Sequence, residues 1–488
     1  MKPGFRQAMT WLHNWSGLVV GWLLLAIAAA GTLSVFRQEL DAWCHPELAR
    51  GPVDQVAAAE AAIRWLGGHA AKSPSWYLDL ADARSPGTLA FWSGGPASGF
   101  VQRTLSPVTG GPDGVRDSLG GEFFYRLHFE LQLPYPWGRW LAAAAAMALL
   151  TTLVTGIVAH RRIFKDFFTL RTHKRQRGWL DGHVVLGVFA LPFHLMIAFT
   201  GAVTLATLWM PFPGLAAYRG DAAAFAQSLS PAIDRPATGH PAPLVPLAPL
   251  LRDAQRRFGE AGIATLSIAD PGDAAQAVTV SAGEGRAIAV QQHDLVYDGT
   301  TGRLLREHVE RRPAVRVYDV LYGLHMGRFA GLAARWFYFL SGAMLTATIA
   351  SGAILWTVKQ RRHHGFGYHL VERLNIGFIA GLPIGFAGFL LANRLIPTGL
   401  ANRAAIEVRC AFGLWGVALA YAARRRPARA WPELLAAAAL TCAAVVVADV
   451  PMFVPDGVAI GVDGVLLLLA VAFGATALRL ATRGRAGG

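Results

Sequence analysis

Histidines that recur at a fixed spacing have the clearest chemical potential in this 488-residue chain. The pattern His-x3-Gly-x13-Gly begins at His13 and occurs again at His183, and a Leu-His pair ends at His128 and again at His325. A haem with two axial ligands needs two neutral imidazoles that face inward from different helices. If two such repeats face each other across an axis normal to the membrane, His13 lies opposite His183, and His128 lies opposite His325.

Two further histidines break the repeat. His160 ends an apolar run at a position where the second repeat has Trp356. His194 follows His183 by 11 residues, which places it about 16 Å further along a helix. Ionisable side chains near the membrane centre are costly and usually functional. The alternative is that histidines at the membrane boundary merely tolerate it, and that duplication alone preserved the repeated ones.

Long apolar runs must position these histidines. Hydrophobic residues make up 53% of the chain and charged residues only 16%, against roughly 25% charged in soluble proteins. Runs of about 20 apolar residues can cross a bilayer. The chain therefore predicts about eight transmembrane helices, near residues 15–36, 140–159, 184–212, 336–358, 374–392, 404–423, 431–449 and 457–481.

The net charge of +14 has a topological explanation. Lys and Arg gather at both termini and in the segments 161–178, 359–373 and 424–430. The positive-inside rule places all of these on the cytoplasmic side, so that both termini of an eight-helix protein lie inside. We therefore expect the lipid bilayer as partner and no nucleic acid.

The two long connections, 37–138 and 210–333, then lie on the opposite side. Each shows a helix pattern followed by strand-like alternation. Gln55–Leu66 and Leu247–Phe258 are the expected helices. The expected strands are Trp76–Leu80, Thr88–Trp92, Thr265–Ile268, Ala277–Ser281 and Ala287–Gln291. Three cysteines give no disulfide framework. The chain also has no nicotinamide, flavin or Walker signature, so any electron donor must be another molecule.

These motifs together resemble the PepSY-associated transmembrane family. The resemblance covers roughly residues 5–360 and rests on Trp11-Leu12-His13, Leu127-His128, Thr155-Gly156-x3-His160, Asp181-Gly182-His183, Pro192-Phe193-His194 and Leu324-His325. It implies an all-α membrane bundle of about eight helices with two small α+β, PepSY-like periplasmic domains. The expected boundaries are 1–36 (first helix), 37–138 (first periplasmic domain), 139–209 (helices two and three), 210–333 (second periplasmic domain), 334–360 (fourth helix) and 361–488 (a C-terminal four-helix extension).

Some members of that family are bacterial inner-membrane ferric-siderophore reductases with two b-type haems. The resemblance therefore implies two molecules of haem b, held by four of six candidates: His13, His128, His160, His183, His194 and His325. Electrons would come from quinol or a cytoplasmic donor and would reduce a ferric siderophore or another ferric chelate. Reduction weakens the hold of oxygen-donor chelators on iron. The alternatives are an iron or siderophore transporter and a non-enzymatic scaffold whose PepSY domains bind a periplasmic partner.

Overall fold

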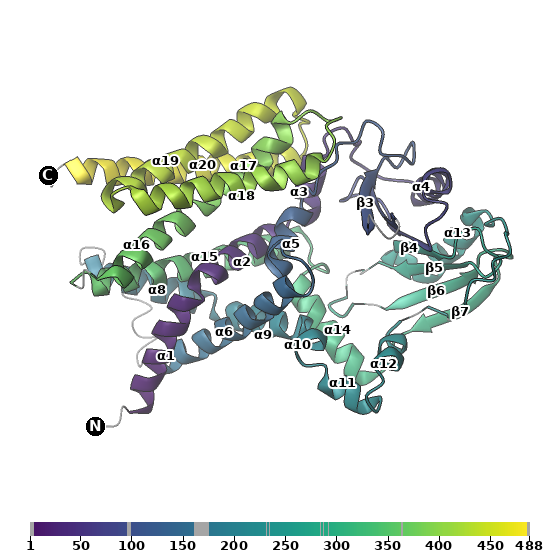
Figure 1. The fold of residues 1–488 in the computed structure, drawn as a ribbon, viewed down its shortest axis with the longest axis horizontal. Helices are drawn as coiled ribbons and strands as arrows, with labels where there is room; N and C mark the ends of the chain where they lie inside the picture. The colour runs from purple at the N-terminus through teal and green to yellow at the C-terminus, as the bar shows by residue number, and fades with distance from the viewer. Residues whose placement is uncertain are drawn as a thin grey trace. The chain divides into compact units, whose positions relative to one another are not determined.

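The chain forms two compact units (Figure 1). A computed structural model describes residues 4–94, 99–160, 175–230, 232–233, 235–283, 285, 287–290, 292–362 and 365–485. The helical unit comprises residues 1–44, 118–205 and 332–488, and the sheet unit comprises 45–117 and 206–331. The basic segment 161–174 lies outside the described residues.

The first and third apolar segments each consist of two helices joined at a sharp bend. α1 (Phe5–Val19) and α2 (Gly21–Ser34) meet at 66°, and α8 (Arg175–Phe189) and α9 (Leu191–Thr204) meet at 68°. The sequence predicts one continuous helix for each segment, so these bends are a correction. They fall at corresponding positions of the repeat.

Local sequence accounts for both bends. Val20 and Ala190 are the residues that separate the paired helices. Gly21 follows the first break, and Pro192 occupies the first turn of α9 after the second. Glycine has no side chain to support the helix, and proline cannot donate the backbone hydrogen bond that a continuous helix would require.

Each bent segment changes its packing partner at the bend. The partners are the unbroken helices α6 (Trp137–Ala159) and α15 (Leu332–Gln360). α1 packs against α6 and α2 against α15, whereas α8 packs against α15 and α9 against α6. The two repeats therefore interlock, which agrees with the internal duplication found in the sequence.

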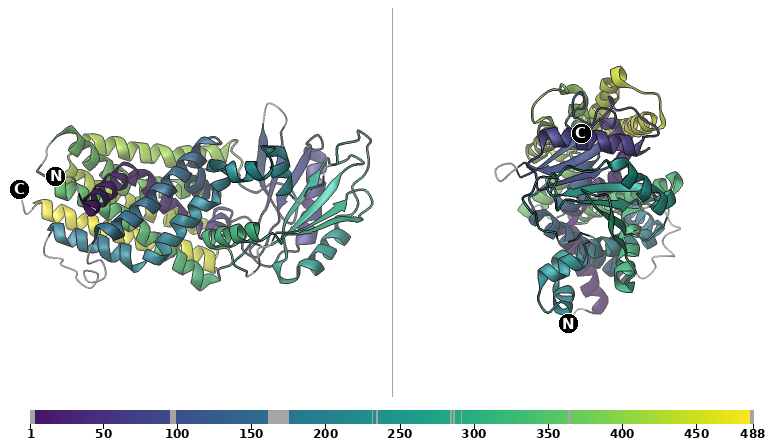
Figure 2. Two further views of the ribbon diagram at one scale, coloured as in Figure 1. Left: turned by 90° about the horizontal axis from the view of Figure 1, so that it is seen from below. Right: turned by 90° about the vertical axis from the view of Figure 1, so that its right-hand side faces the viewer.

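The C-terminal extension joins the same unit. Its helices are α16 (Phe366–Ile379), α17 (Leu382–Leu395), α18 (Arg403–Arg424), α19 (Pro427–Asp449) and α20 (Gly457–Arg485). α19 packs against α17 and α20, and α16 packs against α15 and α2. Figure 2 shows the long helices of this unit running side by side.

A polar side chain connects the extension to the first repeat. Asn375 on α16 accepts a hydrogen bond of 2.9 Å from the Trp22 indole on α2. Its amide also donates a 2.9 Å bond to the Ala353 carbonyl on α15. Asn375 is almost fully buried. One side chain therefore ties three helices together.

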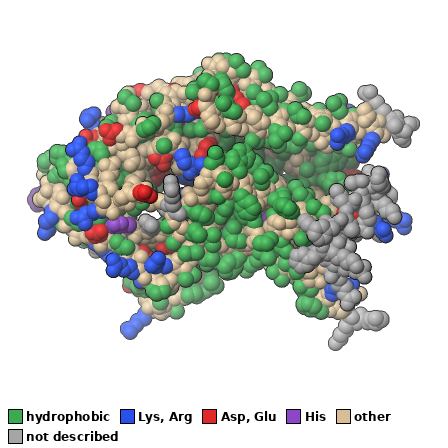
Figure 3. All heavy atoms as spheres, turned by 180° about the vertical axis from the view of Figure 1, so that it is seen from behind, with side chains coloured by type: hydrophobic (Ala, Val, Ile, Leu, Met, Phe, Trp, Pro, Cys, Tyr) green, Lys and Arg blue, Asp and Glu red, His purple; other side chains and the backbone are tan. Residues whose placement is uncertain are grey.

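The helical unit is built to cross a membrane. Six segments among the described residues are long and apolar enough to do so, or up to eight if each bent pair forms one span. Hydrophobic side chains cover most of the face of this unit that Figure 3 presents. The chain is therefore a multi-pass membrane protein, with the short helices α3 (Arg37–Cys44) and α5 (Glu122–Glu130) beside its longer ones.

The sheet unit contains one continuous antiparallel sheet. In the described residues it has seven strands in the order β3-β2-β1-β4-β5-β6-β7. Their bounds are β1 (Ser75–Asp79), β2 (Thr88–Ser93), β3 (Phe100–Leu105), β4 (Ile263–Ala269), β5 (Ala277–Ala282), β6 (His293–Asp298) and β7 (Leu304–Val309). The helices are α4 (Gln55–His69), α10 (Ala206–Trp209), α11 (Phe212–Ala217), α12 (Ala222–Ser228), α13 (Leu247–Phe258) and α14 (Pro313–Met326).

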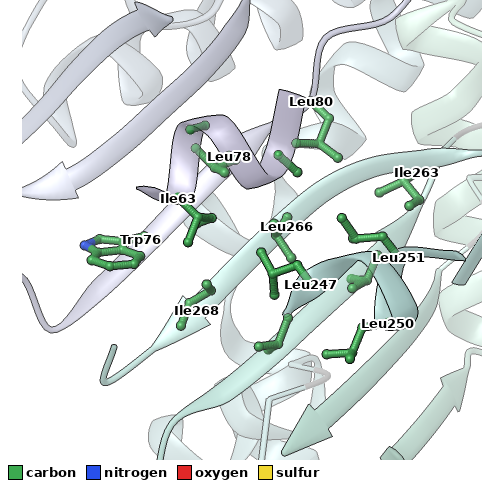
Figure 4. Close-up of a cluster of buried hydrophobic side chains, with 14 of the residues drawn as sticks. Ile63, Trp76, Leu78, Leu80, Leu247, Leu250, Leu251, Ile263, Leu266 and Ile268 are labelled. Atoms are coloured by element: carbon green, nitrogen blue, oxygen red, sulfur yellow. The ribbon is translucent and has the colours of Figure 1, made fainter. Parts of the chain in front are cut away.

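This sheet corrects the expectation of two separate domains. β1 from the first soluble segment pairs with β4 from the second, with Tyr77 opposite Ser267. Each strand would otherwise be an edge with unsatisfied backbone groups, and pairing removes both edges. One core then serves both segments. Figure 4 shows Trp76 and Leu78 gathered with Leu251 and Leu266 in that core.

The strand predictions succeeded only in part. β2, β4 and β5 cover the expected strands, and β1 covers its expected strand except for Leu80. Residues 287–290 of the expected strand Ala287–Gln291 form no strand, and Gln291 lies outside the described residues. The strand of that region is β6, which begins at His293. The chain turns sharply near Gly285, where a positive φ of 56° interrupts any strand from β5 onwards.

Candidate functional site

His13 and His183 face each other within the helical unit. His13 lies on α1 and His183 on α8, and their ring centroids are 6.3 Å apart with an angle of 68° between the ring planes. The two residues hold the same position in the two repeats. The predicted approach of His13 to His183 is therefore confirmed, and we refer to these two residues as the inner pair.

Both rings of the inner pair are held in the same way. Nδ1 of His13 lies 2.9 Å from the Thr152 carbonyl on α6, and Nδ1 of His183 lies 2.9 Å from the Thr348 carbonyl on α15. A carbonyl oxygen only accepts hydrogen bonds, so in each ring Nδ1 carries the proton. A neutral imidazole of this tautomer has its lone pair on Nε2. Such a bond is typical of metal-binding histidines, because it fixes the ring and raises its basicity.

Glycines on the long helices make this approach possible. A Cβ added at Gly156 would lie 2.9 Å from Cε1 of His13, and one added at Gly352 would lie 3.0 Å from Cε1 of His183. The sequence leaves open whether these glycines serve helix packing or the cofactor. In the structure their immediate role is to admit the histidine rings.

The His128 ring is held in the same way, elsewhere in the helical unit. It lies on α5, and its Nδ1 is 2.9 Å from the Ile27 carbonyl on α2. A Cβ at Gly31 would come within 2.6 Å of the same Nδ1. His325 lies on α14 of the sheet unit. The expected pairing of His128 with His325 stays a prediction.

His194 is bound differently from the other candidates. It is fully buried on α9, and its Nε2 lies 3.2 Å from the Ser341 carbonyl on α15. Its Nδ1 has no hydrogen-bond partner among the described residues. The His194 ring thus uses Nε2 for its hydrogen bond, whereas in the inner pair Nε2 stays available to a ligand. This arrangement suits a structural link between α9 and α15 better than axial ligation through Nε2.

His160 lies next to the inner pair rather than in it. It caps the C-terminal end of α6, one turn beyond Gly156. It interacts electrostatically with His183. Lys359, near the end of α15, interacts with both His13 and His183. Sequence reasoning missed Lys359 as a site residue, because it counted only as part of a basic cytoplasmic segment.

The ring separation of the inner pair is compatible with two imidazoles bound to one haem iron. Two imidazoles bound on opposite sides of one metal ion, with bonds of about 2 Å and a ring radius of about 1.1 Å, have centroids roughly 6 Å apart. The observed 6.3 Å agrees with this geometry. No group of three or more His, Cys, Asp or Glu side chains in the described part of the chain could hold a bare metal ion. A porphyrin needs only two protein ligands, because it supplies four nitrogens itself.

The fold and site define a multi-pass membrane protein built from two interlocked repeats with a half-buried histidine pair. The family described as PepSY-associated TM region matches residues 10–359, and the chain belongs to this family. The chain is also similar to an uncharacterised protein of Pseudomonas aeruginosa. The two are 30% identical over 372 residues, which covers 71% of this chain and 91% of the relative.

Proposed function

We propose that this protein is a haem-dependent oxidoreductase of the bacterial inner membrane that reduces a ferric chelate, such as a ferric siderophore, on the periplasmic side. The observation that carries the proposal is the inner pair. Its ring separation suits bis-histidine ligation, and both Nδ1–H groups donate to backbone carbonyls. Two helices from different repeats would each supply one axial ligand.

The protein's own residues would have three tasks in this reaction. Thr152 and Thr348 hold the inner pair in the tautomer that leaves Nε2 for iron. The apolar helices around the pair limit access of water, which tunes the potential of a buried haem. A bound b-type haem supplies one-electron transfer. A quinol or a soluble cytoplasmic molecule would be the donor, since the sequence carries no nicotinamide or flavin signature.

The choice of substrate rests on the family resemblance and on iron chemistry. Siderophores bind Fe(III) through hard oxygen donors, and reduction to Fe(II) weakens that hold. We propose that the sheet unit is PepSY-like and lies in the periplasm, where it would meet the chelate. A second haem, held by two of the remaining candidate histidines, would carry electrons to that side.

The first experiment is an absorption spectrum of the purified protein, oxidised and dithionite-reduced, with haem measured per chain. We expect sharp b-type bands and close to two haems. His13→Ala and His183→Ala should each remove the same haem, whereas His369→Ala, at a half-exposed histidine of α16, should remove none. A colourless protein from haem-replete cells would refute the proposal.

One observation favours a second candidate, a transporter for iron or a siderophore. Transporters with internal repeats often form their substrate site at helices broken within the membrane, and here α1–α2 and α8–α9 break at matching positions. Uptake of labelled ferric siderophore into proteoliposomes without any reductant would support transport. Formation of Fe(II) outside sealed vesicles, with no uptake, would support reduction.

A further inference from the structure

We propose that Lys359 and His160 bind the two propionate groups of the haem held by the inner pair, and so set the orientation of the porphyrin. This inference rests on the proposed haem function. It assigns these two residues as positioning residues for an anionic edge, rather than as iron ligands. His160, one of the candidates for ligation, receives a different role.

Helix geometry places both residues on the faces of α6 and α15 that contact the inner pair. His160 follows Gly156 by one turn of α6, and Gly156 contacts His13. Lys359 follows Gly352 by two turns of α15, and Gly352 contacts His183. Residues four or seven positions apart lie on the same side of a helix. At 1.5 Å per residue they lie about 6 Å and about 10 Å further along their helices.

The electrostatic influence of both residues on the inner pair agrees with this geometry. Lys359 interacts with both rings of the inner pair, and His160 interacts with His183. The two groups therefore approach the pair from opposite long helices and from the same end. A haem carries two carboxylates on one edge, and the Lys359 ammonium from one helix and the His160 imidazole from the other can meet them.

Lys359 also has a charge that the described part of the protein does not neutralise. It takes part in none of the salt bridges formed by described residues, and its side chain is exposed. A carboxylate buried beside apolar helices is costly unless it is paired. Propionates that leave the membrane at this end would meet the Lys359 ammonium first.

The second repeat differs from the first at the position of His160. At the position of His160 it has the large apolar side chain of Trp356. An exact twofold arrangement would offer identical groups to both sides of the porphyrin. The substitution breaks the twofold symmetry of the site, so the two orientations in which the porphyrin could be inserted are no longer equivalent.

The test compares haem with its dimethyl ester, which has the same ring but no carboxylates. Each is titrated into haem-free full-length protein in detergent and followed by absorption. The wild type should bind haem more tightly than the ester, by about threefold to tenfold for partly exposed ion pairs. Lys359→Gln should lose most of this preference, and Lys359→Arg should keep it. His160→Gln should lose part of it.

The matched control is Arg361→Gln, which removes an equal charge two residues away and should keep the wild-type preference. The inference is overturned if Lys359→Gln discriminates between haem and ester as the wild type does. Equal weakening of both compounds also overturns it, because the carboxylates would then make no difference to the effect of Lys359. If the wild type binds neither compound, the proposed haem function itself fails.

A second measurement does not depend on turnover. A positive charge near a haem favours its reduced form, because reduction adds negative charge to the site. Lys359→Gln should therefore lower the midpoint potential of the haem assigned to the inner pair, while Arg361→Gln should leave it nearly unchanged. An unaltered potential in Lys359→Gln would contradict the assignment.

Discussion

Arg394 on α17 and Asp449 on α19 form an ion pair in the interior of the C-terminal extension. Their side chains are 1% and 2% exposed. Arg394 also donates a 2.7 Å bond to the Trp43 carbonyl on α3 and lies 3.4 Å from the centre of the Trp43 ring. The extension thus holds α3 through a buried guanidinium group.

Removal of one partner of this pair should strongly destabilise the helical unit. Asp449→Asn removes the carboxylate that pairs with Arg394, and breaking a buried ion pair typically costs about 3–5 kcal/mol. The measurement is thermal unfolding in detergent, monitored by size-exclusion chromatography. The double variant Arg394→Met, Asp449→Leu should recover part of the loss, because neither charge of this pair then remains buried.

A half-exposed pair provides the control for that experiment. Arg425 and Glu433 are 39% and 37% exposed, and exposed pairs contribute about 0–1 kcal/mol. Glu433→Gln should therefore change the unfolding temperature little. Equal effects of Asp449→Asn and Glu433→Gln would show that the Arg394–Asp449 pair does not stabilise the bundle.

Glycines beside the inner pair should be sensitive to a single methyl group. Gly156→Ala would place a Cβ 2.9 Å from the His13 ring, so the ring must move by several tenths of an ångström. We expect haem affinity to fall by about fivefold or more, since overpacking of this kind typically costs about 1–3 kcal/mol. Gly352→Ala should act similarly on His183.

The control for the glycine variants is Gly416→Ala on α18, where an added Cβ meets nothing within 4 Å. It should leave the haem content unchanged. The readout is haem per chain and the shape of the reduced spectrum. Normal haem content in Gly156→Ala and Gly352→Ala would argue that the inner pair is not the ligand set.

The membrane segments and the inner pair could be predicted from the sequence because both leave local signals. Apolar runs have a length set by the bilayer, and the repeated spacing alone indicates that His13 and His183 face each other. The bends were not predicted. Gly21 and Pro192 are residue types that occur often in membrane helices, so neither indicates a bend by itself. At each bend the chain changes its packing partner between α6 and α15, and this change involves residues far apart in the sequence.

The pairing of strands and of charged residues that lie far apart in the chain could not be predicted from the sequence either. The strands β1 and β4 were both expected, but nothing in either strand indicates that they pair across the two soluble segments. Arg394 and Asp449 lie 55 residues apart. Arg394 falls just past the predicted apolar run 374–392, where an arginine suggests a helix end. Only the packing of α17 against α19 shows that Arg394 is the buried partner of Asp449.

The shared sheet can be tested by a cross-strand disulfide. Tyr77 and Ser267 lie opposite each other in β1 and β4, and directly opposed Cβ atoms are about 4.5–5.5 Å apart. With the native cysteines replaced and a protease site inserted within 161–174, oxidised Tyr77→Cys, Ser267→Cys protein should stay joined after cleavage until it is reduced.

A register-shifted pair gives the control for the disulfide. Thr265 lies opposite Asp79 rather than Tyr77. The variant Tyr77→Cys, Thr265→Cys should therefore form the bond much more slowly. If both double variants cross-link at the same rate, or if neither does, the two soluble segments do not share the β1–β4 pairing.

Acid should loosen the sheet unit through Glu310. The Arg312 side chain donates to both carboxylate oxygens of Glu310 at 2.9 and 3.0 Å, and these bonds lower the Glu310 pKa from its usual 4.5 to about 2. A lowered folded-state pKa stabilises the fold above pH 4.5, and this stability is lost as the pH falls from 4.5 towards 2. Glu310→Gln should therefore destabilise the unit at neutral pH and flatten its response to acid.

Hydrogen exchange of the full-length protein measures this local effect. After correction for intrinsic rates, peptides from β7 and the start of α14 should lose protection between pH 4.5 and 3 in the wild type. The Glu310→Gln variant should start with lower protection and change less across the same range. Glu260→Gln, at an exposed residue, should behave as the wild type. A wild-type response that Glu310→Gln leaves intact would assign the acid sensitivity to another carboxylate.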